Sequence, residues 1–374
     1  VNTNAAPVAE AGTDPKAGAD PQVATDGAGN WVAVWKSEDD LGGTIGTDRD
    51  ILVSRSTDNG ATWTASAALN TNAATDTGGD SSPQVTTDGA GNWVAVWSSS
   101  NDLAGTIGTD TDMLVSRSTD SGETWTIPAP LNNDAASDER NEGNVALTTD
   151  ARGTWIAVWN GNRGPTGLDN DIFVSRSFDN GVTWTNVMPL NTNAASDSKT
   201  DALAAVSTDS AGNWVVIWQS NEDLDGIGTD NDILMARSNN DGMKWTDPIP
   251  LNNNAGSDTG SDGGRPHLTT DGAGHWVAAW ASTEDLSGIG TDSDILVARS
   301  TDNGMSWTDP VPLNTDAATD AEDDRLFGNI STDKLGNWVA VWQVGAFLAE
   351  SDVRIARSVD SGATWTDPVS LNTN

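Results

Sequence analysis

The chain has 374 residues, with 55 acidic against 18 basic residues and a formal net charge of −37 at pH 7. A charge this negative disfavours nucleic acid and anionic membranes as partners, because phosphate-rich surfaces are bound by positive charge. The sequence contains no cysteine and no run of 18 apolar residues, so it has neither a disulfide nor a candidate transmembrane helix.

The sequence predicts four strands in each of six repeats, in an order that the copy at residues 83–131 shows most clearly. A short strand at 83–87 is followed by DGAGN, which is typical of a tight hairpin turn. The next strand, WVAVW at 93–97, is apolar on both faces, as expected for a sheet that is covered on both sides. A polar loop at 98–112 leads to a third strand at 113–118 and, after a second turn, to an outer strand at 124–131.

The turn before the outer strand has the pattern S-x-D-x-G-x-x-W in the repeats, and its first copy is STDNGATW. We expect its aspartate to accept hydrogen bonds from backbone N–H groups two residues on and its glycine to supply a positive φ. The tryptophan is expected to fold back over the turn. The fourth copy, SNNDGMKW, has asparagine in place of the aspartate. The structural residues of the six copies are Asp58, Asp120, Asp179, Asn240, Asp302 and Asp360.

This octet resembles the Asp-box, or BNR repeat, of the sialidase-like β-propellers. The six copies and their flanks cover nearly the whole chain. The resemblance implies an all-β fold, a six-bladed β-propeller with four antiparallel strands per blade and an Asp-box at the turn between the third and fourth strands. It implies an activity less directly, because Asp-boxes also occur in propellers that are not enzymes.

The spacing of the tryptophans supports the same number of blades. The 18 tryptophans divide into three per repeat, and the first of each trio recurs every 59 to 62 residues. This period is the size of a propeller blade. We therefore predict a single domain over residues 1–374, with blades at about 21–69, 83–131, 145–190, 203–251, 266–313 and 328–371.

Each middle strand ends in a second tryptophan, for example Trp35 and Trp97. This residue either packs between blades, which its faithful repetition favours, or is exposed and stacks on a sugar.

Alternating strand directions predict two opposite faces. The hairpin turns after the first strands share one face with the Asp-boxes, and the long loops share the other face with the linkers between blades. Binding sites on such scaffolds usually lie where long loops gather. The long loops of the third and sixth repeats depart from the text that the other four share, so these two blades break the symmetry.

The long loops of four repeats end in GTDxD, which places two carboxylates two residues apart behind a glycine. A further aspartate lies earlier in each loop: Asp40, Asp102, Asp223 or Asp285. Calcium takes about six to eight oxygen ligands, and such a loop can supply them. Either Ca²⁺ is bound in at least one loop, or these aspartates cap turns in a solvated loop. The candidate ligands are Asp48, Asp50, Asp110, Asp112, Asp230, Asp232, Asp292 and Asp294.

Four arginines on the loop-rich face depart from the repeat and are candidates for binding a ligand: Arg140, Arg163, Arg265 and Arg325. Converging arginines hold a carboxylate by paired hydrogen bonds, and the resemblance to sialidases implies such a use. The alternative is ion pairing with the acidic loops around them. Another arginine precedes each Asp-box and is expected to be structural; this set is Arg55, Arg117, Arg176, Arg237, Arg299 and Arg357.

The sequence lacks residues that sialidases use for catalysis. Sialidases have a tyrosine nucleophile, and this chain has no tyrosine. The Arg-Ile-Pro motif expected ahead of the first Asp-box is also missing. A mechanism with two carboxylates stays open, with Glu142 as the first candidate and Glu322 or Asp324 as its partner. The alternative is that these are surface acids.

The sequence thus predicts a secreted or cell-surface binding module without catalysis, with acidic loops ordered by Ca²⁺ and a glycan or an extracellular protein as partner. The alternative is an extracellular exo-glycosidase of sialidase-like fold that uses a carboxylate pair, so whether the chain is an enzyme stays open. No nucleic-acid partner and no insertion into a membrane are expected. The chain starts and stops at the same phase of the repeat, which indicates a segment of a longer secreted protein.

Overall fold

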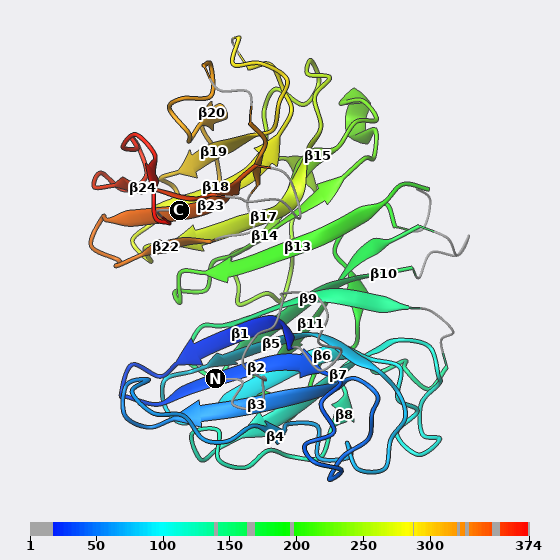
Figure 1. Ribbon diagram of the computed structural model, residues 1–374. Coiled ribbons are helices and arrows are strands. Elements are labelled where there is room, and N and C mark those ends of the chain that lie inside the picture. The colour runs from blue at the N-terminus through cyan, green and yellow to red at the C-terminus, as the bar shows by residue number, and fades with distance from the viewer. Residues whose placement is uncertain are drawn as a thin grey trace. The chain divides into compact units, whose positions relative to one another are not determined.

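The computed structural model describes residues 18–137, 141–162, 169–194, 198–286, 288–319, 322–325, 329–345 and 352–372. Across these residues the strands form six sheets that follow one another along the chain (Figure 1). The chain divides into two compact units, Val1–Asn162 with Phe173–Met188 and Arg163–Ile172 with Pro189–Asn374. Sheets 1 to 3 lie mainly in the first unit, and sheets 4 to 6 lie in the second.

Sheets 1 to 3 each have four antiparallel strands in chain order. Sheet 1 comprises β1 (Ala19–Thr25), β2 (Trp31–Ser37), β3 (Asp50–Ser56) and β4 (Ala67–Ala68). Sheet 2 comprises β5 (Asp80–Thr87), β6 (Trp93–Ser99), β7 (Asp112–Ser118) and β8 (Ala129–Pro130). Sheet 3 comprises β9 (Glu142–Thr149), β10 (Trp155–Gly161), β11 (Asp171–Ser177) and β12 (Met188–Pro189).

Sheets 4 to 6 repeat this arrangement. Sheet 4 comprises β13 (Asp201–Thr208), β14 (Trp214–Ser220), β15 (Asp232–Ser238) and β16 (Ile249–Pro250), with a short 3₁₀ helix η1 (Leu224–Gly226) in its long loop. Sheet 5 comprises β17 (Asp262–Thr270), β18 (Trp276–Ser282), β19 (Asp294–Ser300) and β20 (Val311–Pro312). The inner strand of sheet 6 is split, so this sheet comprises β21 (Asp324–Arg325), β22 (Ile330–Thr332), β23 (Trp338–Val344), β24 (Asp352–Ser358) and β25 (Val369–Ser370).

The second strand of each sheet carries the core, because it is apolar on both faces. In β6, Trp93 and Trp97 pack against Val34 of sheet 1, whereas Val94 on the other side of the strand packs with Trp155 of sheet 3. The same pairing recurs between sheets 4 and 5 and between sheets 5 and 6. The second tryptophan of each of these strands, from Trp35 to Trp342, is at most 4% exposed. From Trp97 to Trp342 these side chains pack in the core, whereas Trp35 also lines an apolar cavity beside sheet 1.

The bounds of the first and fourth strands differ from the predicted ones. In sheet 2 the first strand begins at Asp80 instead of residue 83, because a β-bulge between Ser81 and Gln84 lets the pairing continue past it. The outer strand predicted over 124–131 has only the two residues Ala129–Pro130. The prediction of a longer outer strand was therefore wrong, because Pro130 has no N–H group with which to extend the hydrogen-bonded pairing.

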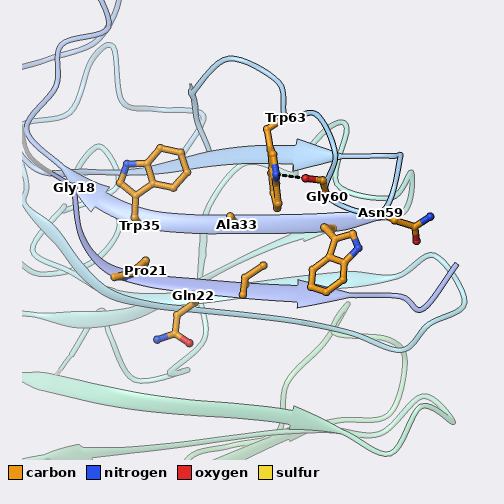
Figure 2. A pocket seen from close by; sticks show the side chains of 10 residues that line it. Gly18, Pro21, Gln22, Ala33, Trp35, Asn59, Gly60 and Trp63 are labelled. Atoms are coloured by element: carbon orange, nitrogen blue, oxygen red, sulfur yellow. Dashed lines mark hydrogen bonds between the residues drawn. The ribbon is translucent and has the colours of Figure 1, made fainter. Parts of the chain in front are cut away.

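Sheet 1 turns its tryptophan face toward an apolar cavity of about 570 Å³ (Figure 2). Trp31, Trp35 and Trp63 line this cavity together with Pro21 and Val23. In sheets 2, 3, 5 and 6 the same face packs against the valines of the preceding sheet. The cavity therefore lies on the face of sheet 1 that corresponds to the packing face of the other sheets. It is not a feature that sheet 1 has in addition to the repeat.

Candidate metal centre

At one end of each sheet, the Asp-box closes its turn by side-chain hydrogen bonds. Asp58 Oδ1 accepts from the Thr62 N–H (2.8 Å) and the Ser56 hydroxyl (2.7 Å), and Oδ2 accepts from the Thr62 hydroxyl (2.6 Å). The N–H donor thus stands four residues after the aspartate, and the prediction of two was wrong, because the Gly60 N–H is donated to Ser56 Oγ (2.9 Å). Gly60 has a φ of +80°, and Trp63 Nε1 donates to its carbonyl (3.0 Å; Figure 2).

The same bonds recur in the other Asp-boxes. Asp120, Asp179 and Asp360 each accept from an N–H four residues on and from a threonine hydroxyl. Asp302 accepts likewise, with a serine hydroxyl. In the fourth copy Asn240 Oδ1 accepts from the Lys244 N–H (3.0 Å), so a neutral amide holds the turn there.

The arginine that precedes an Asp-box links neighbouring sheets. Its guanidinium donates to the backbone carbonyl that follows the aspartate of the next Asp-box, at 2.6 to 2.8 Å in three cases. These pairs are Arg117 with Asn180, Arg237 with Asn303 and Arg299 with Ser361. The contacts give this set of arginines a structural role.

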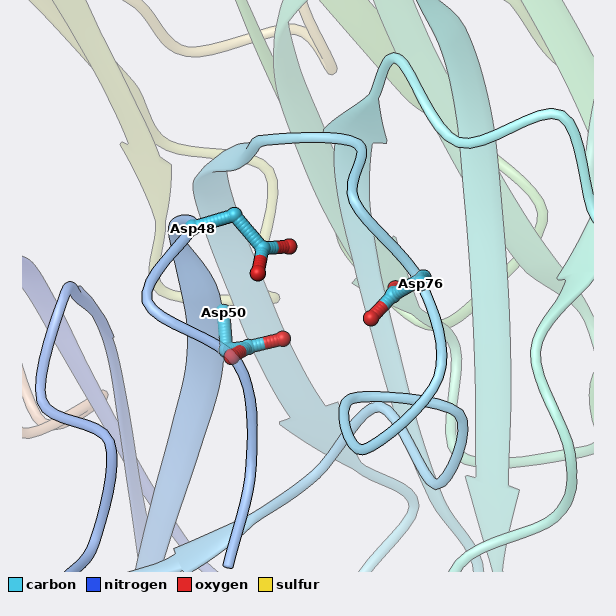
Figure 3. Close-up of side chains that lie close together, drawn as sticks. All are labelled: Asp48, Asp50 and Asp76. Atoms are coloured by element: carbon cyan, nitrogen blue, oxygen red, sulfur yellow. The ribbon is translucent and has the colours of Figure 1, made fainter. Parts of the chain in front are cut away.

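At the opposite end of sheet 1, three carboxylates meet (Figure 3). Asp48 and Asp50 come from the GTDxD segment, and Asp76 comes from the linker to sheet 2. One oxygen from each lies within 4.8 Å of the other two. In the second unit, Asp230, Asp232 and Asp258 form the same cluster. Two of the four predicted pairs are thus completed by an acid that sequence reasoning did not propose.

The repeated sequence of the linkers indicates the third carboxylate of the cluster. They repeat the text LNTNAATD with small variations, and the last aspartate of each copy stands at 76, 138, 197, 258 and 320. The prediction placed the third ligand earlier in the same loop. The carboxylates of Asp40, Asp223 and Asp285 instead accept N–H groups of their own loops, and neither cluster includes them.

Asp50 is the most rigidly held member of the first cluster. Its side chain is 0% exposed, and Oδ1 accepts a hydrogen bond from Asn70 Nδ2 (2.7 Å). Asn70 is fixed in turn, because its own Oδ1 accepts the Ile51 N–H (3.1 Å). The second oxygen of Asp50 is buried without a hydrogen-bond partner among the described residues and faces Asp48 and Asp76 (Figure 3). An unpartnered buried carboxylate oxygen is costly unless a cation is bound to it.

The glycine of GTDxD makes room for the first carboxylate. A Cβ placed on Gly46 would lie 2.2 Å from Asp48 Oδ1, and one on Gly228 would lie 2.7 Å from Asp230 Oδ1. Any side chain at these positions would therefore push the aspartate out of the cluster. This close approach explains why the glycine accompanies the acid pair in the four loops.

Burial raises the pKa of the central carboxylate in each cluster. It raises the pKa of Asp50 to about 7, helped by the charges of Asp76 and Asp48 and opposed by the hydrogen bond from Asn70. Burial likewise raises the pKa of Asp232 to about 7, with the charges of Asp258 and Asp230 acting in the same direction. A bound cation would offset this repulsion and favour the ionised carboxylates.

The geometry and the chemistry of the clusters fit calcium. Two oxygens bound at ~2.3–2.6 Å lie at most ~5 Å apart, which accommodates the spread within each cluster. Carboxylates are hard oxygen ligands of the kind that Ca²⁺ prefers. Asn72, next to the first cluster, donates to Asp76 Oδ2 (2.9 Å), and its own Oδ1 is buried without a partner among the described residues. This amide oxygen, backbone carbonyls and water can complete the coordination.

The other two predicted pairs have the same local structure. Asn132 donates to Asp112 Oδ1 (2.8 Å), and Asn314 donates to Asp294 Oδ1 (2.7 Å), as Asn70 does to Asp50. A Cβ on Gly108 would lie 2.2 Å from Asp110, and one on Gly290 would lie 2.7 Å from Asp292. The linker aspartates at 138 and 320 lie outside the described residues.

Of the arginines proposed to bind a ligand, Arg140 and Arg163 lie outside the described residues. Arg265 lies exposed in β17. Arg325, in β21, forms an ion pair with Asp323 (3.1 Å). For Arg325, this contact matches the alternative of ion pairing with the acidic loops.

Two of the proposed catalytic carboxylates are buried, so for them the alternative of surface acids was wrong. Glu142 is 3% exposed and Asp324 is 0% exposed, and each is the first residue of an inner strand. In sheets 2, 4 and 5 the same position is held by Asp80, Asp201 and Asp262. A buried acid at this place is thus a property of the repeat. The third candidate, Glu322, is exposed and lies 3.6 Å from Arg354.

No protein-family model matches the sequence, and no curated protein does. Solved structures match its fold at low sequence identity. A polysaccharide lyase, PL25 ulvan lyase bound to -[GlcA(1-4)Rha3S]-, is 13% identical with a TM-score of 0.59, over 96% of this chain and 86% of that one. The NanB sialidase of Streptococcus pneumoniae is 9% identical with a TM-score of 0.53, over 96% and 69%.

A third match is the GH93 α-L-arabinofuranosidase of Fusarium graminearum, at 13% identity and a TM-score of 0.51, over 87% of this chain and 88% of that one. The chain spans 66% of the length of another match, the Hadza microbial sialidase Hz136. The three structures with TM-scores above 0.5 show a β-propeller fold, in agreement with the successive antiparallel sheets. In the described part of the chain, no helix is long and apolar enough to cross a membrane.

Proposed function

We propose that the chain is a secreted or cell-surface, non-catalytic glycan-binding module whose loops are ordered by Ca²⁺. The observation that carries the proposal is the pair of aspartate clusters, each with a buried central aspartate and with buried carboxylate oxygens that have no hydrogen-bond partner among the described residues. Extracellular modules bind Ca²⁺ with dissociation constants of ~10⁻⁴–10⁻³ M, which suits a site built from surface loops.

The support for a glycan as ligand is the kind of protein that shares the fold. The matching structures include a sialidase, a polysaccharide lyase and an arabinofuranosidase. Because one fold hosts many functions, this support is by analogy. An extracellular protein is the second candidate for the ligand, since the loop-rich ends of the sheets also suit a protein partner.

The support for a lack of catalysis comes from residues. The chain has no tyrosine to act as a sialidase-type nucleophile. Glu142 and Asp324 occupy a position where sheets 2, 4 and 5 also have an acid, so they are not specific to the two divergent repeats. The alternative is an exo-glycosidase that uses a carboxylate pair, and it is favoured by the enzymes that share the fold.

Two measurements test this proposal. Calorimetric titration of the metal-free protein with Ca²⁺ should show saturable binding, and no heat above that of Mg²⁺ would contradict the metal centre. Incubation with a panel of aryl glycosides, a sialoside included, should release no product in the presence of Ca²⁺. Turnover that is lost in Glu142→Gln would support the glycosidase instead.

We also propose that the six sheets close into one six-bladed ring, as six copies of the Asp-box imply. Such a ring would cover the tryptophan face of sheet 1. A compact domain of 374 residues has a radius of gyration of about 21 Å. Small-angle scattering should give a value near this one, and a clearly larger radius would indicate two units that move separately.

A further inference from the structure

A cavity of about 620 Å³ lies between the linker that leaves sheet 1 and the long loop of sheet 2. It lies wholly within the first unit. Its volume falls in the range of ~300–1,000 Å³ that is usual for small-molecule sites. The residues that matter for its chemistry are Asn72, Asp76, Asn101, Asp102, Leu103 and Ile127.

Ile127 departs from the repeat at the wall of this cavity. It stands two residues after the Asp-box tryptophan and is 78% exposed. The prolines at 128 and 130 line the cavity beside it. Together with Leu103 and these prolines, Ile127 forms an apolar part of the cavity wall, at a position where the other repeats have a small or polar residue. The equivalent residues of the other repeats are Ala65, Asn186, Asp247, Asp309 and Asp367.

Asn101 is a second departure, and it links the cavity to the metal cluster. The equivalent residue in the other three GTDxD loops is acidic, Asp39, Glu222 or Glu284. Asn101 instead donates its amide to Asp76 Oδ2 (2.6 Å). The other oxygen of Asp76 is buried without a partner among the described residues, and Asp76 belongs to the cluster with Asp48 and Asp50. One aspartate thus forms part of the cavity wall and part of the metal centre, so a bound cation would fix the wall.

The charge of the lining favours a neutral ligand. Among the described residues that line it, Asp76 and Asp102 are the charged ones, and none is a lysine or an arginine. Two carboxylates repel the carboxylate or sulfate of an acidic sugar. Asp102 is exposed and can accept hydrogen bonds from hydroxyl groups, while Leu103 and Ile127 offer an apolar surface. A neutral sugar ring combines hydroxyl donors with an apolar C–H face and matches both features.

We propose that this cavity is the ligand site of the module and that it binds a neutral saccharide when Ca²⁺ occupies the cluster of Asp48, Asp50 and Asp76. Asp102 accepts hydrogen bonds from the sugar hydroxyls, and Ile127 packs against the C–H face of the ring. The inference rests on the proposed glycan-binding function and adds to it the place, the charge of the ligand and the dependence on metal.

The test compares two single substitutions that introduce the same residue. Ile127→Asp changes the cavity wall, and Ala65→Asp places an aspartate at the equivalent exposed position of sheet 1. Three repeats have aspartate there naturally, so both variants should fold, and thermal unfolding checks this. Binding is measured by calorimetry with neutral tetrasaccharides of glucan, mannan and xylan, and with sialyllactose and an oligogalacturonate as acidic probes.

We expect the wild type and Ala65→Asp to bind a neutral probe in Ca²⁺ and to lose this binding in EDTA, and Ile127→Asp to bind at least tenfold more weakly. If glycans bind and Ile127→Asp has no effect, or if an acidic probe is preferred, this site is wrong while the glycan-binding function stands. If no probe binds to the wild type, the proposed function and the site both fail. Binding that persists in EDTA would refute the dependence on metal.

Discussion

The two ends of sheet 1 use aspartate in opposite ways. At the Asp-box end, Asp58 is exposed, and hydrogen bonds from Thr62 and Ser56 lower its pKa to about 2. At the other end, Asp50 is buried, and the lack of solvent raises its pKa to about 7. The first carboxylate is stable as an anion within its own turn, whereas burial disfavours the charge of the second one and a bound cation would offset that cost. The same residue therefore closes a turn at one end and builds a binding site at the other.

Removal of the metal should change the melting temperature more than any substitution discussed below. It should destabilise only the end of the sheet that carries the aspartate cluster. A ligand present at 100 times its dissociation constant stabilises a protein by about 2.7 kcal/mol per site. We therefore expect chelation to lower the melting temperature by several degrees in calorimetry, and Ca²⁺ to restore it. An unchanged melting temperature would contradict the proposal that the aspartates at one end bind a cation.

Substitution of one aspartate at each end should separate them further. Asp50→Asn removes a repulsive charge, so the metal-free variant should be more stable than the metal-free wild type, yet it should gain less stability from Ca²⁺. Asp58→Asn keeps one acceptor but loses the charge, so it should lower the melting temperature equally with and without Ca²⁺. If Ca²⁺ raised the melting temperatures of both variants by the same amount, the expected difference between the two ends would be contradicted.

The pH dependence of the metal-free protein should have opposite signs at the two ends. Asp58 and Asp360, whose pKa values are lowered to about 2 by their threonine hydrogen bonds, contribute stability above pH 4 that is lost toward pH 2. Burial raises the pKa values of Asp50 and Asp232 from 3.8 to about 7, so ionisation of these residues lowers the stability as the pH rises from about 4 to 7. Without Ca²⁺ the melting temperature should therefore peak near pH 4, and with Ca²⁺ the peak should move toward neutral pH.

The smallest effect should come from a link between sheets at the Asp-box end. Arg117→Ala removes the hydrogen bond to the Asn180 carbonyl and should cost about 1–3 kcal/mol. This loss should be the same in EDTA and in Ca²⁺, because the contact lies at the end away from the metal. Arg117→Lys should recover part of it. A loss seen only in Ca²⁺ would show that the two ends are coupled.

The four-stranded sheets could be predicted well from the sequence, because each local feature recurs in all six repeats. The octet, the apolar strand WVAVW and the glycine-rich turn each depend on neighbours in sequence, and the sheets follow from them. The metal centre was predicted in part. Asp48 and Asp50 are adjacent to a glycine that marks them, but Asp76 meets them only through the packing of the next linker, and no local rule gives that contact.

The limits of sequence reasoning were different at the other predicted residues. The outer strand was overestimated because the proline that shortens it, Pro130, was not weighed against the apolar residues around it. Glu142 was predicted as a catalytic candidate because its blade was expected to begin at residue 145, which placed Glu142 in the preceding linker. Comparison of Glu142 with Asp80 and Asp262 shows that the repeat places an acid there.

The two-residue outer strands have a consequence for how copies of this chain meet one another. A sheet edge with free N–H and C=O groups invites a strand from another molecule, and β16 and β20 also expose Ile249 and Val311. In β8, β12, β16 and β20 the second of the two residues is proline, which has no donor to offer such a strand. The edge of each of these sheets is therefore a poor template for a strand from another copy of the chain.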